Sequence, residues 1–271
     1  MKAETIVLTG AAGRIGRLLR PSLAACCAHL RLVDQAPVYA ERANESAFQC
    51  DLGDSERLLE IMQGSTAVVH FAGYPREAEW SVLLSANVVG AVNLWEAARL
   101  AGVKRVVYAS SNHAVGFYPR SEVISHQSLP APDSRYGVTK VFMESLAGLY
   151  AAKHGIRGFG MRIGHCSEKP TDARMLSHWV HPQDLAALVQ VGLSADYLHE
   201  LVYGVSANSL SWWSNERAQA LGYRPQKTAD VWIGELQSLV SHDPVAEHFQ
   251  GGSFASAEFQ GASPLRSGAQ P

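Results

Sequence analysis

The chain has 271 residues, of which 47% are hydrophobic and 18% are charged, and its formal net charge is -2. This composition suits a large globular domain, and without a block of lysines and arginines a nucleic-acid partner is not expected. No apolar run approaches the roughly 18 residues of a membrane span. The N-terminus also lacks the long apolar segment of a signal peptide. We therefore expect a cytoplasmic protein with no membrane partner.

The histidines and cysteines give little indication of a metal site. His178 and His181 have HxxH spacing, but no carboxylate or third ligand is evident. The cysteines are interpreted as small buried thiols in a reducing compartment; they are Cys26, Cys27, Cys50 and Cys166. We expect no metal ion.

The first predicted strand leads into a glycine-rich turn. Thr5–Thr9 is a short apolar run, and Gly10, Gly13 and Gly16 follow it at the start of a predicted helix. Such glycines let the backbone approach a pyrophosphate, whose charge the first N–H groups of the helix favour. The usual fingerprint is GxGxxG, whereas this spacing is GxxGxxG, and glycines can also serve turns alone. The position between strand and helix favours a dinucleotide-binding loop.

An acidic residue ends the second predicted strand, Leu30–Asp34. Asp34 follows Gly16 by 18 residues, close to the roughly 20 residues expected of the carboxylate that binds an adenosine ribose. Such a carboxylate accepts hydrogen bonds from both ribose hydroxyls and repels a 2′-phosphate, which predicts NAD rather than NADP. The alternative is a strand-end aspartate that caps the next turn.

Strands and helices then continue to alternate. The predicted strands are Phe48–Leu52, Ala67–Gly73 and Val103–Ala109, and the predicted helices are Ser55–Met62 and Trp80–Ala101. His70, inside one of these strands, is interpreted as a core histidine. This alternation predicts an α/β fold with a doubly wound parallel sheet, whose ligands bind at the carboxyl ends of the strands. Candidate residues lie just past five of those ends: Gly10, Asp34, Asp51, Gly73 and Ser111.

The segment from Tyr108 to Lys140 carries the candidate chemistry. Ser111 follows the fifth strand, and Tyr136 and Lys140 lie one turn apart on the predicted helix Ser134–Lys153. A hydroxyl, a phenol and an ammonium near one strand end can share a proton, and we hypothesise a redox catalytic centre. The neighbouring Asn112 and His113 could bind substrate or could be turn residues.

The YxxxK spacing is weak evidence by itself. It occurs again at Tyr223 and Lys227, where Pro225 breaks the helix. We dismiss this second copy.

The remaining chain is predicted to form a smaller region. A sixth strand, Ile156–Ile163, is followed by a loop from His165 to His178. The later predictions are a helix at Leu185–Leu193, a strand at Leu201–Val205, a helix at Leu210–Leu221, and a Gly/Ser/Ala-rich tail from Phe249. The start of the tail is expected to pack on the body or on a partner subunit, and its end to be mobile. We divide the chain into a dinucleotide-binding domain, 1–163, and a substrate-binding region with the tail, 164–271.

Several motifs together resemble a known family. TGAAGRIG, Asp34, NVVGAVNLWEAAR, ASSN and YGVTK resemble the extended short-chain dehydrogenase/reductase superfamily (NAD-dependent epimerase/dehydratase-like) over nearly the whole chain. SSNHAVGFYP, MRIGHC, RMLSHW, LSWWSN, LGYRP and FQGGSF are more specifically similar to the uronate dehydrogenases. That resemblance implies a Rossmann-like fold and NAD-dependent oxidation of C1 of D-glucuronate or D-galacturonate to the aldarolactone. It also implies a uronic acid substrate. We expect a homo-oligomer because homo-oligomers are common among soluble proteins.

The resemblance also implies roles for individual residues. The catalytic residues would be Ser111, Tyr136 and Lys140. The cofactor-binding residues would be Gly10, Gly13, Arg14, Ile15, Gly16, Asp34, Asp51, Leu52, Ala72, Gly73, Tyr136 and Lys140. The substrate-binding residues would be Ser111, Asn112, His113, Tyr136, His165 and Arg174. Arg174 would face the sugar carboxylate, although an isolated loop arginine is ordinarily exposed.

Two positions depart from the family pattern. His165 stands where the family has a serine, and the loop after Gly73 reads Tyr74-Pro75-Arg76 where the family offers a serine hydroxyl. Both changes affect the expected preference between uronates. They do not affect the expected hydride chemistry, in which Tyr136 acts as base.

The pKa of that tyrosine, ordinarily about 10, is expected to be lowered by Lys140 and the nicotinamide.

Two other functions remain open at this point. A nucleotide-sugar epimerase or dehydratase would use the same tyrosine and lysine, but it needs a larger C-terminal region than residues 164–271 provide. A non-catalytic NAD-sensing regulator would need the glycine loop but not an intact Ser, Tyr and Lys set.

Overall fold

A computed structural model describes residues 3–261, and the last residues of the predicted tail, 262–271, lie outside this range. Within the described range, seven parallel strands form one sheet in the order β3-β2-β1-β4-β5-β6-β9. Their bounds are β1 (Ala3–Thr9), β2 (Cys27–Asp34), β3 (Glu45–Gln49), β4 (Ala67–His70), β5 (Arg105–Ser111), β6 (Arg157–Ile163) and β9 (His199–Gly204). Two short strands, β7 (His165–Cys166) and β8 (Trp179–Val180), pair separately.

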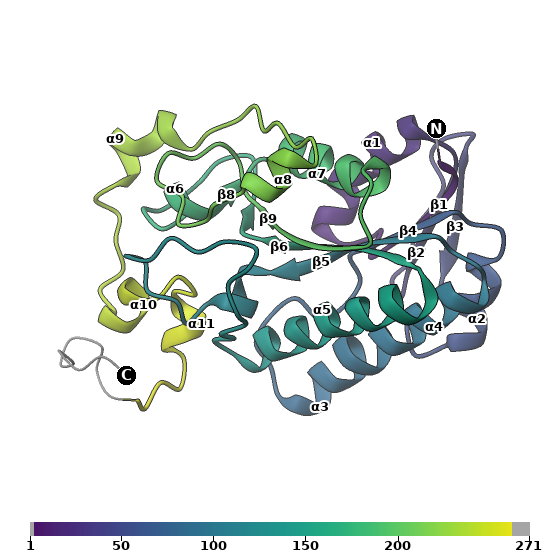
Figure 1. Cartoon of the computed structure of the whole chain (residues 1–271), viewed down its shortest axis with the longest axis horizontal. Coiled ribbons are helices and arrows are strands. Elements are labelled where there is room, and N and C mark those ends of the chain that lie inside the picture. The colour runs from purple at the N-terminus through teal and green to yellow at the C-terminus, as the bar shows by residue number, and fades with distance from the viewer. Residues whose placement is uncertain (1–2, 262–271) are drawn as a thin grey trace.

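Helices cover both faces of this sheet (Figure 1). The helical elements are α1 (Arg14–Cys26), α2 (Ser55–Met62), α3 (Trp80–Leu83), the π-helix Leu84–Val89, α4 (Gly90–Leu100), the 3-10 helix Asn112–Val115, α5 (Arg135–His154), α6 (Met175–His178), α7 (Pro182–Ser194), α8 (Glu216–Ala220), the 3-10 helix Asp230–Trp232, α9 (Ile233–Leu236), α10 (Pro244–His248) and α11 (Ser253–Ser256). The predicted α/β, doubly wound parallel architecture is thus confirmed.

Each face of the sheet has its own apolar core. On one face, Leu23 of α1 and Leu185 of α7 are buried against the strands. On the other face, Leu58 of α2, Trp95 of α4 and Tyr150 of α5 are buried. At roughly 25 cal/mol per Å² of apolar surface removed from water, these two layers supply the main driving force for folding.

The helix predicted at Trp80–Ala101 is continuous but contains a π-helical turn at Leu84–Val89. By length and hydropathy alone, Trp80–Leu100 could cross a membrane, although the sequence contains no uninterrupted apolar run of that length. In the structure its inner side, including Leu94 and Trp95, is buried against the sheet. This packing is that of a core helix in an α/β fold.

Several boundaries differ from the sequence predictions. The third strand occupies Glu45–Gln49 instead of Phe48–Leu52, so Asp51 lies beyond it in a turn. The fourth strand ends at His70, whose Nδ1 lies 2.7 Å from the Thr9 hydroxyl, as suits a core histidine. The segment predicted as a loop at 165–178 contains β7 and α6.

The helix predicted at Leu210–Leu221 is largely wrong. Only Glu216–Ala220 is helical. Trp213 lies in an extended segment, where its indole N–H donates to the Gln250 side chain at 2.9 Å and its ring stacks on Tyr203. These distant partners override the helical periodicity. Tyr223, from the dismissed YxxxK copy, is buried with its hydroxyl bonded to the Val205 carbonyl.

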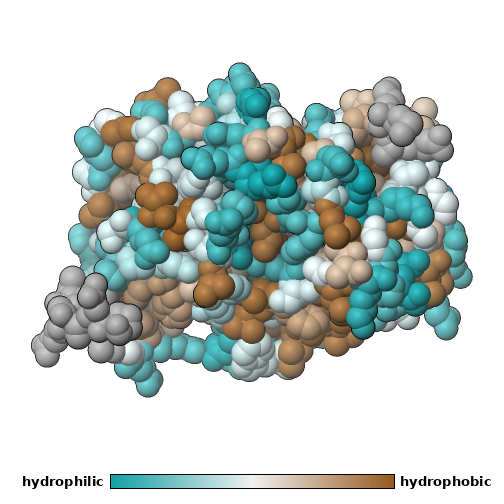
Figure 2. Space-filling view, viewed as in Figure 1, coloured by the Kyte–Doolittle hydropathy of each residue, from teal (hydrophilic) through white to brown (hydrophobic). Residues whose placement is uncertain are grey.

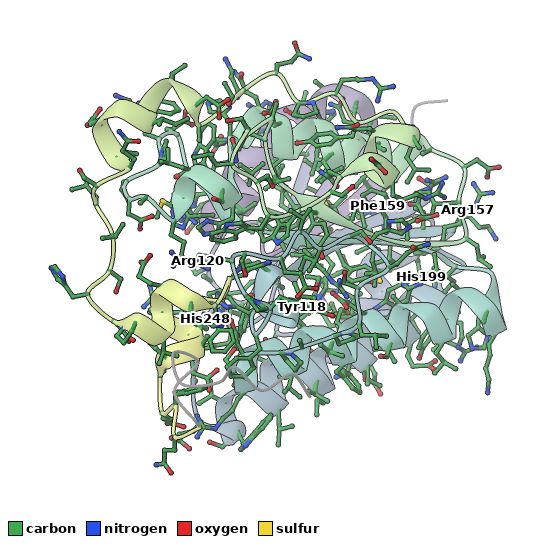
Figure 3. All side chains as sticks on the ribbon, turned by 60° about the vertical axis from the view of Figure 1, so that its left-hand side comes forward. Tyr118, Arg120, Arg157, Phe159, His199 and His248 are labelled. Carbon is green, nitrogen blue, oxygen red and sulfur yellow. The ribbon has the colours of Figure 1, made fainter. Side chains whose placement is uncertain are left out.

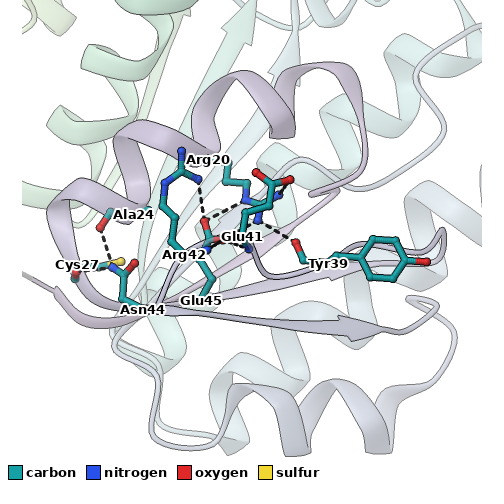
Figure 4. A network of polar contacts seen from close by, with 8 residues as sticks. All are labelled: Arg20, Ala24, Cys27, Tyr39, Glu41, Arg42, Asn44 and Glu45. Carbon is teal, nitrogen blue, oxygen red and sulfur yellow. Dashed lines mark hydrogen bonds and ion pairs between the residues drawn. The ribbon is translucent and has the colours of Figure 1, made fainter.

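A buried ion pair fixes the outer end of α1 far from the strand ends at which ligands are expected (Figure 4). Arg20 donates to both carboxylate oxygens of Glu45 and to the carbonyl of Tyr39. Glu45 also accepts the backbone N–H groups of Glu41 and Arg42, at 2.8 and 3.0 Å. The hydrogen bonds from Arg20 are the largest cause that holds the pKa of Glu45 at about 2. The carboxylate therefore stays ionised and ties β3 to the helix.

Candidate functional site

A cavity of about 1200 Å³ opens at the carboxyl ends of the strands. It is lined by all of the predicted site residues: Gly10, Gly13, Arg14, Ile15, Gly16, Asp34, Asp51, Leu52, Ala72, Gly73, Ser111, Asn112, His113, Tyr136, Lys140, His165 and Arg174. The structure therefore brings together residues that are separated by more than half of the chain.

The glycine-rich turn is built for close approach of the backbone. Gly10 has a φ of 74°, and a Cβ there would lie 2.5 Å from the carbonyl carbon of Phe71. A Cβ on Gly16 would lie 2.1 Å from the Gly10 oxygen. The N-cap residue Gly13 has no side chain to cap α1, so the positive end of the helix faces the cavity. These features fit a dinucleotide pyrophosphate.

The structure shows the turn-capping role of Asp34 and places its carboxylate in the cavity. Its two oxygens accept the N–H groups of Ala12 and Ala36, each at 2.9 Å. It thereby braces the glycine-rich turn, and the remaining lone pairs of the carboxylate face the cavity. Asp51 accepts the N–H of Gly53 at 2.7 Å and lies on the same side of the cavity. Both carboxylates are placed to accept hydroxyl groups.

The hydroxyl, phenol and ammonium meet at the end of β5. Ser111 is the last residue of β5, and its hydroxyl accepts the N–H of His113. The Lys140 ammonium donates to the Ala109 carbonyl at 2.9 Å and lies 5.3 Å from the centre of the Tyr136 ring. Helix α5 places the tyrosine and the lysine on one face, as the spacing predicts.

The pKa values of this group differ from the expectation. Burial raises the pKa of Tyr136 to about 12, and the hydrogen bond with Ser111 only partly opposes this rise. Burial also lowers the pKa of Lys140 to about 8, against the influence of Glu144. The expected lowering of the tyrosine pKa is therefore absent from the protein alone, because desolvation disfavours both charged forms.

The opposite end of the cavity is cationic. Arg174 is half-buried, and its Nε and Nη2 donate to the carbonyl of Gln250 at 3.0 and 2.6 Å. Burial lowers the pKa of this guanidinium to about 10, so it remains charged at neutral pH. The amide of Asn112, with its oxygen toward the arginine, accepts from Nη2 at 3.2 Å and donates to the Ile163 carbonyl at 3.1 Å. Arg174 is thus a held side chain in a cavity wall and not an exposed loop residue.

Residues 249–254, the C-terminal strap, close this end of the cavity. The Phe254 ring stacks on His113 with ring centres 3.8 Å apart and meets Tyr136 edge-on at 6.1 Å. His113 is fixed from its other side by Asp133, at 2.8 Å. The strap glycines permit this fit, because a Cβ on Gly251 would lie 1.8 Å from the Asp133 carboxylate.

The side chain of Gln250 anchors the strap to the body. It donates to the carbonyls of Pro119 and Glu122 and accepts from Trp213. The loop that contains Pro119 and Glu122 also contacts α10. The N–H of Arg120 donates to the His248 carbonyl at 2.8 Å, and these residues lie together in Figure 3. On this side the start of the predicted tail packs on the body.

The histidines of this region do not form a metal centre. His165 is half-buried in the cavity. Burial is the main cause that lowers the pKa of His165, and the positive charge of Arg14 lowers it further. His178 bonds to the carbonyl of Arg174, whereas His181 caps α7 and pairs with Glu168 at 3.2 Å. Within residues 3–261 no group of three or more His, Cys, Asp or Glu side chains is arranged to hold a metal ion.

Sequence reasoning missed two contributors to the cavity. Phe254 had only the FQGGSF motif as a signal, and a motif does not say which ring it covers. Asn87, buried in the π-helical turn, bonds both backbone groups of Tyr74 and the hydroxyl of Thr139. It joins the loop after β4 to α5. Asn87 is one of several polar residues in this helix, so the sequence did not single it out.

Comparisons with known proteins agree with this geometry. Residues 6–199 match the model of the NAD dependent epimerase/dehydratase family. A uronate dehydrogenase from Pseudomonas syringae pv. tomato is 38% identical over 93% of both chains. The crystal structure of glucuronic acid dehydrogenase from Chromohalobacter salexigens is 38% identical, covers 98% of this chain and 100% of its own, and has a TM-score of 0.89.

A mutant uronate dehydrogenase from Agrobacterium tumefaciens, solved as a complex with NAD, is 35% identical. It covers 93% of this chain and 97% of its own, with a TM-score of 0.89. Each of these three relatives is matched over at least 93% of this chain. This chain therefore belongs to the NAD dependent epimerase/dehydratase family.

Proposed function

We propose that this protein oxidises the C1 hydroxyl of a hexuronic acid, D-glucuronate or D-galacturonate, to the aldarolactone with NAD as the hydride acceptor. One observation carries the proposal. A single cavity places the Ser111, Tyr136 and Lys140 group between a dinucleotide-type glycine turn and a half-buried arginine, Arg174. The similarity to uronate dehydrogenases over 93% of the chain supports the same reaction.

The residues at the glycine-turn end fit NAD. The backbone from Gly10 to Gly16 would hold the pyrophosphate, and Asp34 would accept the hydroxyls of the adenosine ribose. The turns at Asp51–Leu52 and Ala72–Gly73 would border the adenine and the nicotinamide side. Lys140 would also reach the nicotinamide ribose. When bound, NAD supplies the electron-deficient ring that accepts a hydride.

The catalytic step needs a base for the C1 hydroxyl. Tyr136 takes the hydroxyl proton, Ser111 orients the same hydroxyl, and C1 releases a hydride as the lactone carbonyl forms. Because burial alone raises the pKa of Tyr136 to about 12, the phenolate depends on nearby positive charge. Lys140 supplies part of this charge, and a cationic nicotinamide adds to it in the complex.

The cationic end of the cavity selects an acid sugar. One edge of the Arg174 guanidinium, its Nε and Nη2 groups, donates to the Gln250 carbonyl, and its remaining N–H groups can bind a carboxylate. Asn112 and His113 would contact the sugar beside it. His165, held neutral at this end, and the Tyr74-Pro75-Arg76 loop would set the preference between uronates.

One assay tests the proposal. The full chain is supplied with NAD and, separately, with glucuronate, galacturonate, glucose, glucose 6-phosphate and a UDP-sugar, and NADH formation is followed. We expect stoichiometric NADH with a uronate and little with neutral glucose. Turnover of the UDP-sugar without net NADH would instead indicate an epimerase. NAD binding without any turnover would indicate a regulator.

We propose that the chain divides functionally into a cofactor domain, 1–163, and a substrate-binding region, 164–271. The second region also contributes β9 to the sheet. A cytoplasmic location suits a sugar-acid oxidation that draws on the cellular NAD pool.

We also propose a homo-oligomer. Figure 2 shows apolar residues gathered along the side of the molecule where α3 and α4 lie. In this helical segment, Trp80, Leu84 and Val89 are 42 to 52% exposed, which is unfavourable for a permanently solvated surface.

A further inference from the structure

The loop between β4 and α3 reaches the first turn of α5 through one carboxylate. Glu77 accepts the backbone N–H of Tyr136 at 2.8 Å and that of Arg135 at 3.2 Å. The N-cap residue Ser134 accepts the next N–H, from Gly137, at 3.0 Å. A carboxylate at this end of a helix satisfies N–H groups that have no partner within the helix and favours the helix dipole.

Arg135 extends this contact to the C-terminal part of the chain. Its guanidinium pairs with Glu77 at 2.9 Å and with Glu258 at 2.9 Å. Glu258 follows the strap and has a φ of 59°, a conformation that non-glycine residues rarely adopt. One arginine between two carboxylates thus ties the loop after β4 and the end of the strap to the start of α5.

We propose that Glu77 is a positioning residue that fixes Tyr136 relative to the cofactor and to Ser111. The inference rests on the proposed function in that Tyr136 is taken to be the base. The loop that carries Glu77 starts at Gly73 in the cavity, and both backbone groups of Tyr74 are held by Asn87. The hydrogen bond that Glu77 accepts from the N–H of Tyr136 therefore couples the position of the cofactor-side loop to the backbone of the tyrosine.

This link goes beyond ordinary capping. Ser134 already caps the helix locally, whereas Glu77 lies 59 residues before Tyr136, on the loop between β4 and α3. A shift of about 1 Å in a reacting group can lower turnover by as much as about 100-fold. Loss of Glu77 should therefore affect the chemical step more than binding of either ligand.

The chain offers a matched control. Glu45 also accepts two backbone N–H groups and pairs with an arginine, Arg20, but it lies at the far edge of the sheet. A purely structural role for Glu77 predicts that Glu77→Ala and Glu45→Ala behave alike. A positioning role predicts that only Glu77→Ala lowers the turnover of folded enzyme.

The experiment compares the full-length parent, Glu77→Ala, Glu77→Gln and Glu45→Ala at saturating NAD and glucuronate, below the Tm of each. We expect kcat of Glu77→Ala to fall at least about 10-fold, with both KM values within about threefold of the parent. Glu77→Gln, which keeps an acceptor oxygen, should lose less. Glu45→Ala should keep the parental kcat. A kcat of Glu77→Ala within twofold of the parent, or an equal loss in Glu45→Ala, overturns the inference.

A second readout does not depend on turnover. Amide hydrogen exchange at Tyr136 should accelerate in Glu77→Ala and remain parental in Glu45→Ala; unchanged exchange at Tyr136 also overturns the inference. The activity of the parent enzyme distinguishes a failure of the proposed function from a failure of this inference. If the parent does not oxidise a uronate, that function is wrong, and the exchange measurement still decides whether Glu77 holds the tyrosine.

Discussion

The two ends of the cavity are built by different means. At the glycine-turn end, each group comes from a strand and the turn directly after it, and most contacts use the backbone. At the cationic end, Arg174 is held by Gln250 from 76 residues later, and Phe254 covers His113. The first end depends on local chain geometry, and the second depends on side chains that only the folded chain brings together.

This difference separates the energetics of the two ligands. The glycine-turn end can bind a dinucleotide whatever the sugar, whereas the cationic end can select the sugar without altering the dinucleotide site. Tyr136 lies between the two ends. Substitutions can therefore be ordered by whether they remove the chemistry, one ligand, or only stability.

The largest effect is expected at Tyr136, which lies between the two ends of the cavity. Tyr136→Phe removes the base but keeps the ring that meets Phe254 and Lys140. Turnover should fall about 1000-fold, while the NAD dissociation constant, measured by titration calorimetry, stays within a few-fold of the parent. Retained turnover would show that another group removes the proton.

The next largest effect is expected at the cationic end. Arg174→Ala should lower kcat/KM for glucuronate about 100-fold or more, because a charged partner of the carboxylate is lost. The KM for NAD should change little. An equal loss for NAD and uronate would mean that the two ends are not separable.

A smaller effect is expected at the glycine-turn end. Asp34→Asn keeps an oxygen for the N–H groups of Ala12 or Ala36 but removes the charge that repels a 2′-phosphate. The ratio of kcat/KM for NAD to that for NADP should fall about 10-fold or more. A ratio equal to the parental one would remove Asp34 from cofactor selection.

The smallest effect on activity is expected at the buried pair of Figure 4. Glu45→Ala should cost about 3 kcal/mol of stability, because buried Arg20 loses its buried carboxylate partner and keeps only the exposed carboxylate of Glu41. The pKa of Glu45 is depressed in the folded protein, from 4.5 to about 2. Its stabilisation is therefore complete above about pH 5 and is lost as the pH falls toward 2.

Thermal unfolding of the parent and Glu45→Ala at several pH values measures this change. The difference in Tm should be largest near neutral pH and should shrink between pH 5 and pH 2. A difference that does not depend on pH would mean that packing, not charge, accounts for the loss.

The same contrast explains what could be predicted from sequence. The glycine turn, Asp34 and the Tyr136–Lys140 pair are local patterns that follow strand and helix periods, and they were placed correctly in one cavity. Glu77 and Phe254 could not be assigned, because their partners lie 59 or more residues away. The burial that raises the pKa of Tyr136 is likewise a property of the assembled fold.

The errors in the fold have a similar origin. The helix predicted at Leu210–Leu221 has suitable periodicity, but Trp213 finds its partners in Tyr203 and Gln250. The predicted bounds of the third strand were shifted because its edge position leaves Phe48 half-buried and Gln49 exposed, so the apolar pattern marks the ends of the strand poorly. Local patterns are reliable only where no distant contact outweighs them.

The strap has a consequence for how substrate range can evolve. Six consecutive residues, 249–254, supply the carbonyl that aims Arg174 and the ring that covers His113. None of the seven sheet strands in the described chain includes these residues. Recombination or mutation of this short segment can therefore exchange one sugar specificity for another while the hydride machinery is inherited unchanged.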